Sequence, residues 1–158
     1  MLFGRAGEEI DALRRAGIEF EVVPGISTAF AAAAALEASL TDRRKASRVV
    51  FTTGHRAQPG ASEGTTQVIY MPGPDYSAIV GRLLQEGFAR ETPCAVVSAV
   101  SREAQTTIRT TLGSLPDMGP LPAPSILLVG EALADARENV AGDQSGWEAF
   151  TKYPSITA

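Results

Sequence analysis

The spacing of hydrophobic and polar positions changes along the chain, and each change marks a predicted element. In residues 4–17 the apolar side chains recur every three or four positions, which predicts an amphipathic helix. Residues 18–25 alternate and then run apolar into a Pro-Gly pair, which predicts a strand that ends in a turn. Residues 26–39 place Ser27 and Thr28 before an alanine tract, which predicts a second helix capped by one of these hydroxyls.

The rest of the chain alternates between strand and helix patterns. Residues 74–87 repeat as a helix that begins at Asp75, and the threonine-rich segment 103–115 follows its neighbour so closely that the two strands must be antiparallel. Together these elements predict an α/β domain with a mixed sheet. The polar tail after residue 136 lacks periodicity, and we expect it to be poorly ordered. The later segments with strand patterns are residues 46–55, 65–73, 92–101, 103–115 and 125–133.

Composition and charge narrow the function classes. The formal net charge of −4 leaves no basic excess for nucleic acid as the main partner. Cys94 is the only cysteine, which excludes an intrachain disulfide and a cysteine-based zinc site and indicates a reducing, cytoplasmic setting. Glu37 interrupts the longest apolar run, so we expect no membrane span, and a charge as early as Arg5 argues against a signal peptide. The Gly-rich Rossmann and P-loop patterns do not occur.

Several phrases, taken in order, resemble one family. "FGRAGEE" and "FEVVPGISTAF" resemble the FGRGGEE and VPGIT segments of the uroporphyrinogen-III C-methyltransferases, which are tetrapyrrole methylases. The later phrases "FTTGH", "VIYMPG", "PCAVVSAVS", "TTLGSL" and "SILLVGEAL" resemble the TGH, YMG, PVAVV, GTL and VGEVV segments of the same family. The likeness extends over about residues 3–133, which is most of the chain.

The resemblance implies an α/β fold class: the mixed-sheet C-terminal domain of the tetrapyrrole methylase fold, plus the last helix and strand of the N-terminal domain. We therefore expect residues 1–25 to be a remnant of the N-terminal domain, residues 26–136 to be the C-terminal domain, and residues 137–158 to be a polar tail. The family's Gly-Pro-Gly-Asp and Gly-Gly-Asp-Pro loops do not occur here, so we expect a truncated form.

The resemblance also implies donor contacts. A helix start and small hydroxyl residues allow a ligand to approach the backbone, although Ser27 and Thr28 also fit a plain helix cap. Met71 has a thioether suited to a flat adenine, although a methionine at a strand end is often core filler. Val100 stands where the family has glycine, and its bulk puts close donor approach in doubt. The residues that the family likeness places at S-adenosylmethionine are Leu2, Pro24, Ser27, Thr28, Met71 and Val100.

Two arginines are candidates for the acidic substrate. Arg5 lies in the FGR phrase and Arg43 follows "LTD", and a guanidinium fork matches the carboxylates of a tetrapyrrole. Asp42 replaces the family's histidine beside Arg43. His55, the sole histidine, is read as the end of a strand rather than as a general base. A methyl group on a sulfonium is already activated, so we assign no catalytic residue and no metal.

The function implied is the S-adenosylmethionine-dependent C-methylation of uroporphyrinogen III to precorrin-2, for sirohaem and cobalamin, by a cytoplasmic homodimer. Two alternatives stay open. One is another precorrin methylase. The other is a non-catalytic remnant, or a split half that dimerises or needs a separate N-terminal half. Because the two loops are missing, we expect the chain alone to bind S-adenosylmethionine weakly or not at all.

Overall fold

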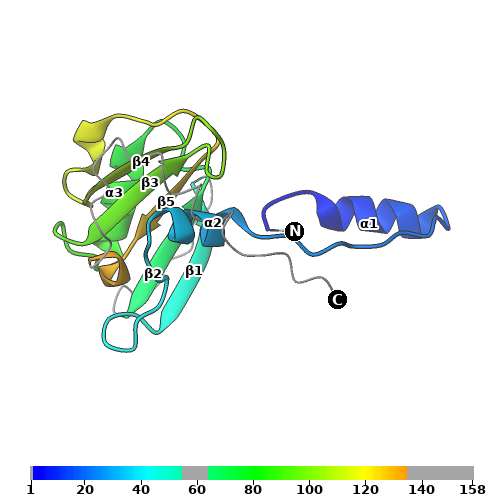
Figure 1. Cartoon of the computed structure of the whole chain (residues 1–158), viewed down its shortest axis with the longest axis horizontal. Coiled ribbons are helices and arrows are strands. Elements are labelled where there is room, and N and C mark those ends of the chain that lie inside the picture. Colours follow the sequence, from blue (N-terminus) through cyan, green and yellow to red (C-terminus); the bar gives the residue numbers. More distant parts are fainter. Residues whose placement is uncertain (1, 55–63, 135–158) are drawn as a thin grey trace, which may run out of the picture.

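A five-stranded mixed sheet forms the centre of the structure (Figure 1), a computed structural model that describes residues 2–54 and 64–134. The predictions for His55 and for residues 137–158 lie outside the described residues. The strand order is β1-β2-β5-β3-β4. Strands β1 and β2 are parallel and every other neighbouring pair is antiparallel, as the sequence predicts for the last hairpin. The strands are β1 Arg48–Thr53, β2 Thr65–Tyr70, β3 Pro93–Ser98, β4 Thr106–Thr111 and β5 Ser125–Val129.

Helices lie on both faces of this sheet (Figure 1). Both predicted caps are confirmed, because the side chain of Ser27 accepts from the first turn of α2 and that of Asp75 accepts from the first turn of α3. The helices are α1 Ala6–Arg15, α2 Thr28–Ala35 and α3 Tyr76–Gln85, with short 3-10 turns η1 Leu115–Met118 and η2 Glu131–Leu133.

Two hydrophobic clusters pack on opposite faces of the sheet. Because successive strand residues point to opposite faces, Val68 packs in the cluster under α2, whereas Ile69 packs in the cluster under α3. The α2 cluster contains small residues such as Ala32, which let this alanine-rich helix lie close to the strands. The α3 cluster contains larger side chains, including the fully buried Leu83. The alternation along the buried strands therefore predicts which face each side chain covers.

Three strands end at the same edge of the sheet. Strands β2 and β3 both run antiparallel to β5, and β1 runs parallel to β2, so β1, β2 and β3 share one direction. We call the edge where these three strands end the carboxyl edge. In open α/β sheets, ligands bind outside the carboxyl ends of the strands.

The predicted strand at residues 18–25 is wrong, because no described strand pairs with this segment. The segment is extended and returns alongside α1, which stands away from the sheet (Figure 1). The amide of Ile18 donates to Leu13, and the Arg14 guanidinium lies 6.0 Å from the centre of the Phe20 ring. Helix α1 has no buried residue. The alternating pattern is that of a strand, but a strand also needs a neighbour to hydrogen-bond with, and the described residues supply none.

Candidate functional site

The carboxyl edge brings together predicted donor contacts from distant parts of the sequence. Ser27 begins α2 above this edge, and its Oγ lies 2.5 Å from the hydroxyl of Tyr70, the last residue of β2. Met71 follows Tyr70 directly, and Val100 lies in the turn after β3. Four of the six predicted donor contacts, the pair Ser27–Thr28 together with Met71 and Val100, therefore belong to the same edge of the sheet.

A small hydrogen-bond network fixes the start of α2. The amide of Ala29 lies 3.3 Å from the Ser27 Oγ and 3.3 Å from the Tyr70 hydroxyl, so it donates to both oxygens. The amides of Phe30 and Ala31 donate to the carbonyl of Ser27. Most of the N–H groups of this first turn are thus already bonded within the protein. Within the described ranges, Thr28 is the residue of this turn whose amide and hydroxyl have no partner.

Met71 is held in a left-handed backbone conformation with an accessible side chain. Its φ is 50°, and the side chain is half-exposed. The amide of Gly54, at the end of β1, donates to the Tyr70 carbonyl at 2.9 Å. A Cβ on Gly54 would lie 2.5 Å from the Met71 carbonyl oxygen, so only glycine permits this close approach. The end of β1 therefore supports the backbone that presents Met71.

Val100 does not occupy a backbone conformation that requires glycine. Left-handed φ values occur instead at its neighbours, Ala99 with 49° and Ser101 with 62°. The Val100 side chain is partly buried and packs against the α2 cluster. Its extra bulk is therefore taken up at least in part by the protein core. Replacement of a glycine here changes the size of the residue without straining the backbone.

The two remaining predicted donor contacts are exposed. Leu2 and Pro24 lie on the surface. Next to Leu2, the ring of Phe3 packs on Tyr70, with the two ring centres 5.1 Å apart. Phe3 and Tyr70 were not predicted as site residues. The sequence gives only a weak indication of their role, namely that each is an aromatic residue directly beside a predicted contact. Only the fold shows that the two rings are in contact.

The predicted substrate arginines lie apart from each other. Arg5 forms an ion pair with Glu8 on α1. Arg43 is exposed in the connection that leads into β1, at the opposite end of the strands from Met71, which is roughly 20 Å for a six-residue strand. Asp42 pairs with Arg44 at 3.0 Å rather than with Arg43. The hydrogen bonds from Arg44 lower the pKa of Asp42 to about 2.

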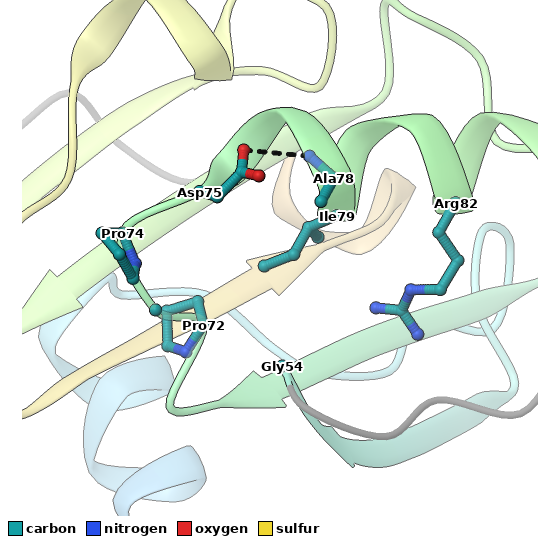
Figure 2. A pocket seen from close by; sticks show the side chains of 8 residues that line it. Gly54, Pro72, Pro74, Asp75, Ala78, Ile79 and Arg82 are labelled. Atoms are coloured by element: carbon teal, nitrogen blue, oxygen red, sulfur yellow. Dashed lines mark hydrogen bonds between the residues drawn. The ribbon is translucent and has the colours of Figure 1, made fainter.

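A cavity of about 350 Å³ opens on the α3 side of the carboxyl edge (Figure 2). Gly54 and Pro72 form one wall, and Asp75 caps α3 by accepting from the Ala78 amide at 3.2 Å. The Arg82 side chain extends from α3 toward this space (Figure 2). Its Nη1 lies 3.7 Å from a carboxylate oxygen of Glu86, one turn further along the helix. The cavity is thus lined by a cation that already has an ionic partner.

A family model for the tetrapyrrole (corrin/porphyrin) methylases matches residues 1–116. The chain belongs to this family. It is 39% identical over 153 residues to the siroheme synthase of Tolumonas auensis, a match that covers 90% of this chain and 33% of that protein. It is 36% identical over 172 residues to the siroheme synthase of a Neisseria meningitidis serogroup C strain, covering 99% of this chain and 36% of that protein. The chain thus spans about a third of the length of these methylase relatives.

Solved methylase structures share the fold. A uroporphyrin-III-C-methyltransferase from Thermus thermophilus is 40% identical with a TM-score of 0.72, covering 85% of this chain and 58% of that one. A structure of uroporphyrin-III C-methyltransferase from the same organism in complex with S-adenosyl homocysteine is 26% identical with a TM-score of 0.73, covering 85% of this chain and 63% of that one. A cobalt precorrin-4 methyltransferase is 25% identical with a TM-score of 0.72, covering 84% and 60%. The predicted family and α/β class are confirmed.

No cluster of three or more His, Cys, Asp or Glu side chains suited to a metal ion was found in residues 2–54 and 64–134. In the same residues, no helix has both the length and the apolar character needed to cross a membrane.

Proposed function

We propose that the chain takes part in the S-adenosylmethionine-dependent C-methylation of uroporphyrinogen III to precorrin-2, and that its carboxyl edge forms one side of the donor site. The observation that carries the proposal is the meeting of Ser27, Thr28 and Met71 at that edge, through the contact between Ser27 and Tyr70. The likeness to a uroporphyrin-III-C-methyltransferase at 40% identity supports the choice of acceptor. The complex of a similar methyltransferase with S-adenosyl homocysteine supports the choice of donor.

The residues at this edge fit a nucleoside with a sulfonium side chain. A half-exposed thioether at Met71 suits the face of a purine ring. The amide and hydroxyl of Thr28, which have no partner among residues 2–54 and 64–134, can bond to polar atoms of the ligand. S-adenosylmethionine supplies an activated methyl group when it is bound. What the chain's own residues do is hold the ligand in one orientation and exclude water.

Calorimetric titration with S-adenosylhomocysteine tests the donor site. Met71→Ala should weaken binding roughly tenfold, because the thioether contact with the ring is lost. Met118→Ala is the matched control: Met118 is 46% exposed against 48% for Met71, but it lies in η1, away from the carboxyl edge. Equal effects of the two substitutions, or none from Met71→Ala, would count against the proposal. Transfer of labelled methyl from S-adenosylmethionine to uroporphyrinogen III tests the acceptor, with a precorrin as the competing acceptor.

The second candidate is a half-protein that needs a partner, and the exposed apolar segment after α1 favours it. Val23 is 77% exposed and Ile26 is 86% exposed, and neither lies against the sheet. We propose that this segment packs on a polypeptide carrying the family's Gly-Pro-Gly-Asp and Gly-Gly-Asp-Pro loops. The chain alone then binds the donor weakly, and mixing it with such a polypeptide raises both affinity and methyl transfer. Micromolar binding by the chain alone would exclude this candidate.

We also propose a homodimer that uses the outer side of α2. This helix is apolar on every side, yet Phe30 is 57% exposed. A helix that is hydrophobic all round is normally buried on all sides. Light scattering should therefore give twice the mass of one chain, and Phe30→Glu should reduce it to one. An unchanged mass for Phe30→Glu would place the dimer contact elsewhere. We also propose that the protein is located in the cytoplasm.

A further inference from the structure

The Tyr70 side chain contacts several parts of the candidate donor site. Its hydroxyl meets both the Ser27 Oγ and the Ala29 amide. Its ring packs against Phe3, with ring centres 5.1 Å apart, and against Phe51, with ring centres 6.5 Å apart. Tyr70 thus joins β2, β1, the start of α2 and the N-terminal segment, and it is covalently attached to Met71.

The hydrogen atoms of the two hydroxyls can be counted. Ser27 and Tyr70 each have one hydroxyl hydrogen, and one of the two lies between their oxygens, which are 2.5 Å apart. The Ala29 amide donates to both oxygens, so it fills an acceptor position on each and uses no hydroxyl hydrogen. One hydroxyl hydrogen therefore remains, and it has to point away from the pair.

The chemistry of the two groups decides which hydrogen remains. A phenol is more acidic than an aliphatic alcohol and is the better hydrogen-bond donor. Tyr70 therefore donates to Ser27, and the Ser27 hydrogen is the one left over. The Tyr70 ring is held by its aromatic neighbours, so the phenol oxygen is fixed in place and the rotation of the Ser27 hydroxyl is restricted in turn.

We infer that Tyr70 is a positioning residue of the donor site: by donating to Ser27 Oγ, it directs the Ser27 hydroxyl hydrogen toward an acceptor atom of the bound nucleoside. The inference rests on the proposed function for the identity of the ligand. It assigns Ser27 a second role beside capping, that of a directed donor. It also explains why a tyrosine rather than a phenylalanine at the end of β2 suits this site.

The test compares Tyr70→Phe with Tyr76→Phe. Tyr76 is buried on the opposite face of the sheet, where its hydroxyl accepts from the Leu121 amide at 3.2 Å. Each substitution removes one hydroxyl and keeps the ring: Tyr70→Phe loses the bonds to Ser27 and to the Ala29 amide, and Tyr76→Phe loses the bond to the Leu121 amide. Both should lower the melting temperature. Only Tyr70→Phe should raise the Kd for S-adenosylhomocysteine, by about fivefold to tenfold, which is the loss of one net hydrogen bond.

A double variant separates positioning from general loosening. If Tyr70 acts through Ser27, then Ser27→Ala with Tyr70→Phe should raise the Kd no further than Ser27→Ala alone. Additive effects, or a Tyr70→Phe protein with the Kd of the wild type, would overturn the inference.

Hydrogen exchange in the free chain tests the role of Tyr70 without ligand, and so independently of the proposed function. Tyr70→Phe should speed exchange of the Ala29 amide, because one of its two acceptors is gone, whereas Tyr76→Phe should not. If the wild type does not bind S-adenosylhomocysteine, the proposed function fails for this chain, and the exchange rates alone decide the role of Tyr70. Unchanged exchange at Ala29 in Tyr70→Phe would then refute it.

Discussion

Gly54→Ala tests the backbone contact that presents Met71. The new Cβ would lie 2.5 Å from the Met71 carbonyl oxygen and 3.0 Å from two backbone atoms of Pro72. These are backbone atoms, which cannot swing aside as a side chain can, so the 71–72 turn must move by about half an ångström or more. Overpacking of this kind costs about 1–3 kcal/mol, and strain on the 2.9 Å bond between the Gly54 amide and the Tyr70 carbonyl adds to it.

We therefore expect Gly54→Ala to lower the free energy of unfolding by about 2–3 kcal/mol, or the melting temperature by roughly 4–12 °C, as followed by circular dichroism. The same variant should weaken binding of S-adenosylhomocysteine, because Met71 is displaced. Gly81→Ala is the control, since a Cβ there meets nothing within 4 Å and the residue lies inside α3. That variant should be more stable than the wild type by about 0.5–1 kcal/mol. A Gly54→Ala protein that melts at the wild-type temperature would show the reasoning to be wrong.

Three further predictions concern single side chains. Arg109→Met should lower the free energy of unfolding by about 2 kcal/mol in urea titrations, because the 2.6 Å bond from its guanidinium to the Leu36 carbonyl at the end of α2 is lost. Burial raises the pKa of the Cys94 thiol to about 12, so Cys94 should react with a thiol reagent only after unfolding. The unfolded thiol ionises from about pH 9, so stability should fall as the pH rises above that value, and Cys94→Ala should remove this part of the fall. Asp42 should stay ionised down to about pH 2 in an NMR titration, and its contribution to stability, present above its ordinary pKa of 3.8, should be lost as the pH falls toward 2. In Arg44→Ala the pKa of Asp42 should rise toward the ordinary value but stay below it, because the 2.7 Å bond from the backbone amide of residue 44 is kept.

Much of the fold could be predicted because its signals are local. Asp75 and Ser27 are standard cap residues directly before helical patterns, and both cap as expected. The threonine-rich hairpin strand was predicted from alternation and a short connection, and β4 confirms it. The segment 18–25 has an equally clear alternation but no strand, because pairing depends on a neighbour that a local pattern cannot reveal.

The candidate site could be predicted only in part, because its contacts join distant residues. The hydroxyls of Ser27 and Tyr70 are in contact although the two residues are 43 positions apart in the sequence, and no local pattern predicts that contact. Likewise, the need for glycine at position 54 arises from the carbonyl of Met71, which only the pairing of β1 with β2 brings near. The separation of Arg43 from this edge is also a result of topology, since α2 carries the chain from one end of the sheet to the other.

The two hydrophobic clusters have a consequence for engineering this domain. They share no residue, and the strands send alternate side chains to each of them. The cluster around Leu83 can therefore be redesigned for heat resistance while the face under α2, which carries the hydroxyl pair at the start of that helix, keeps its native side chains. Stabilising substitutions can therefore be made on one face of the sheet, and substitutions that change ligand preference on the other. The effects of the two sets of substitutions should be nearly additive.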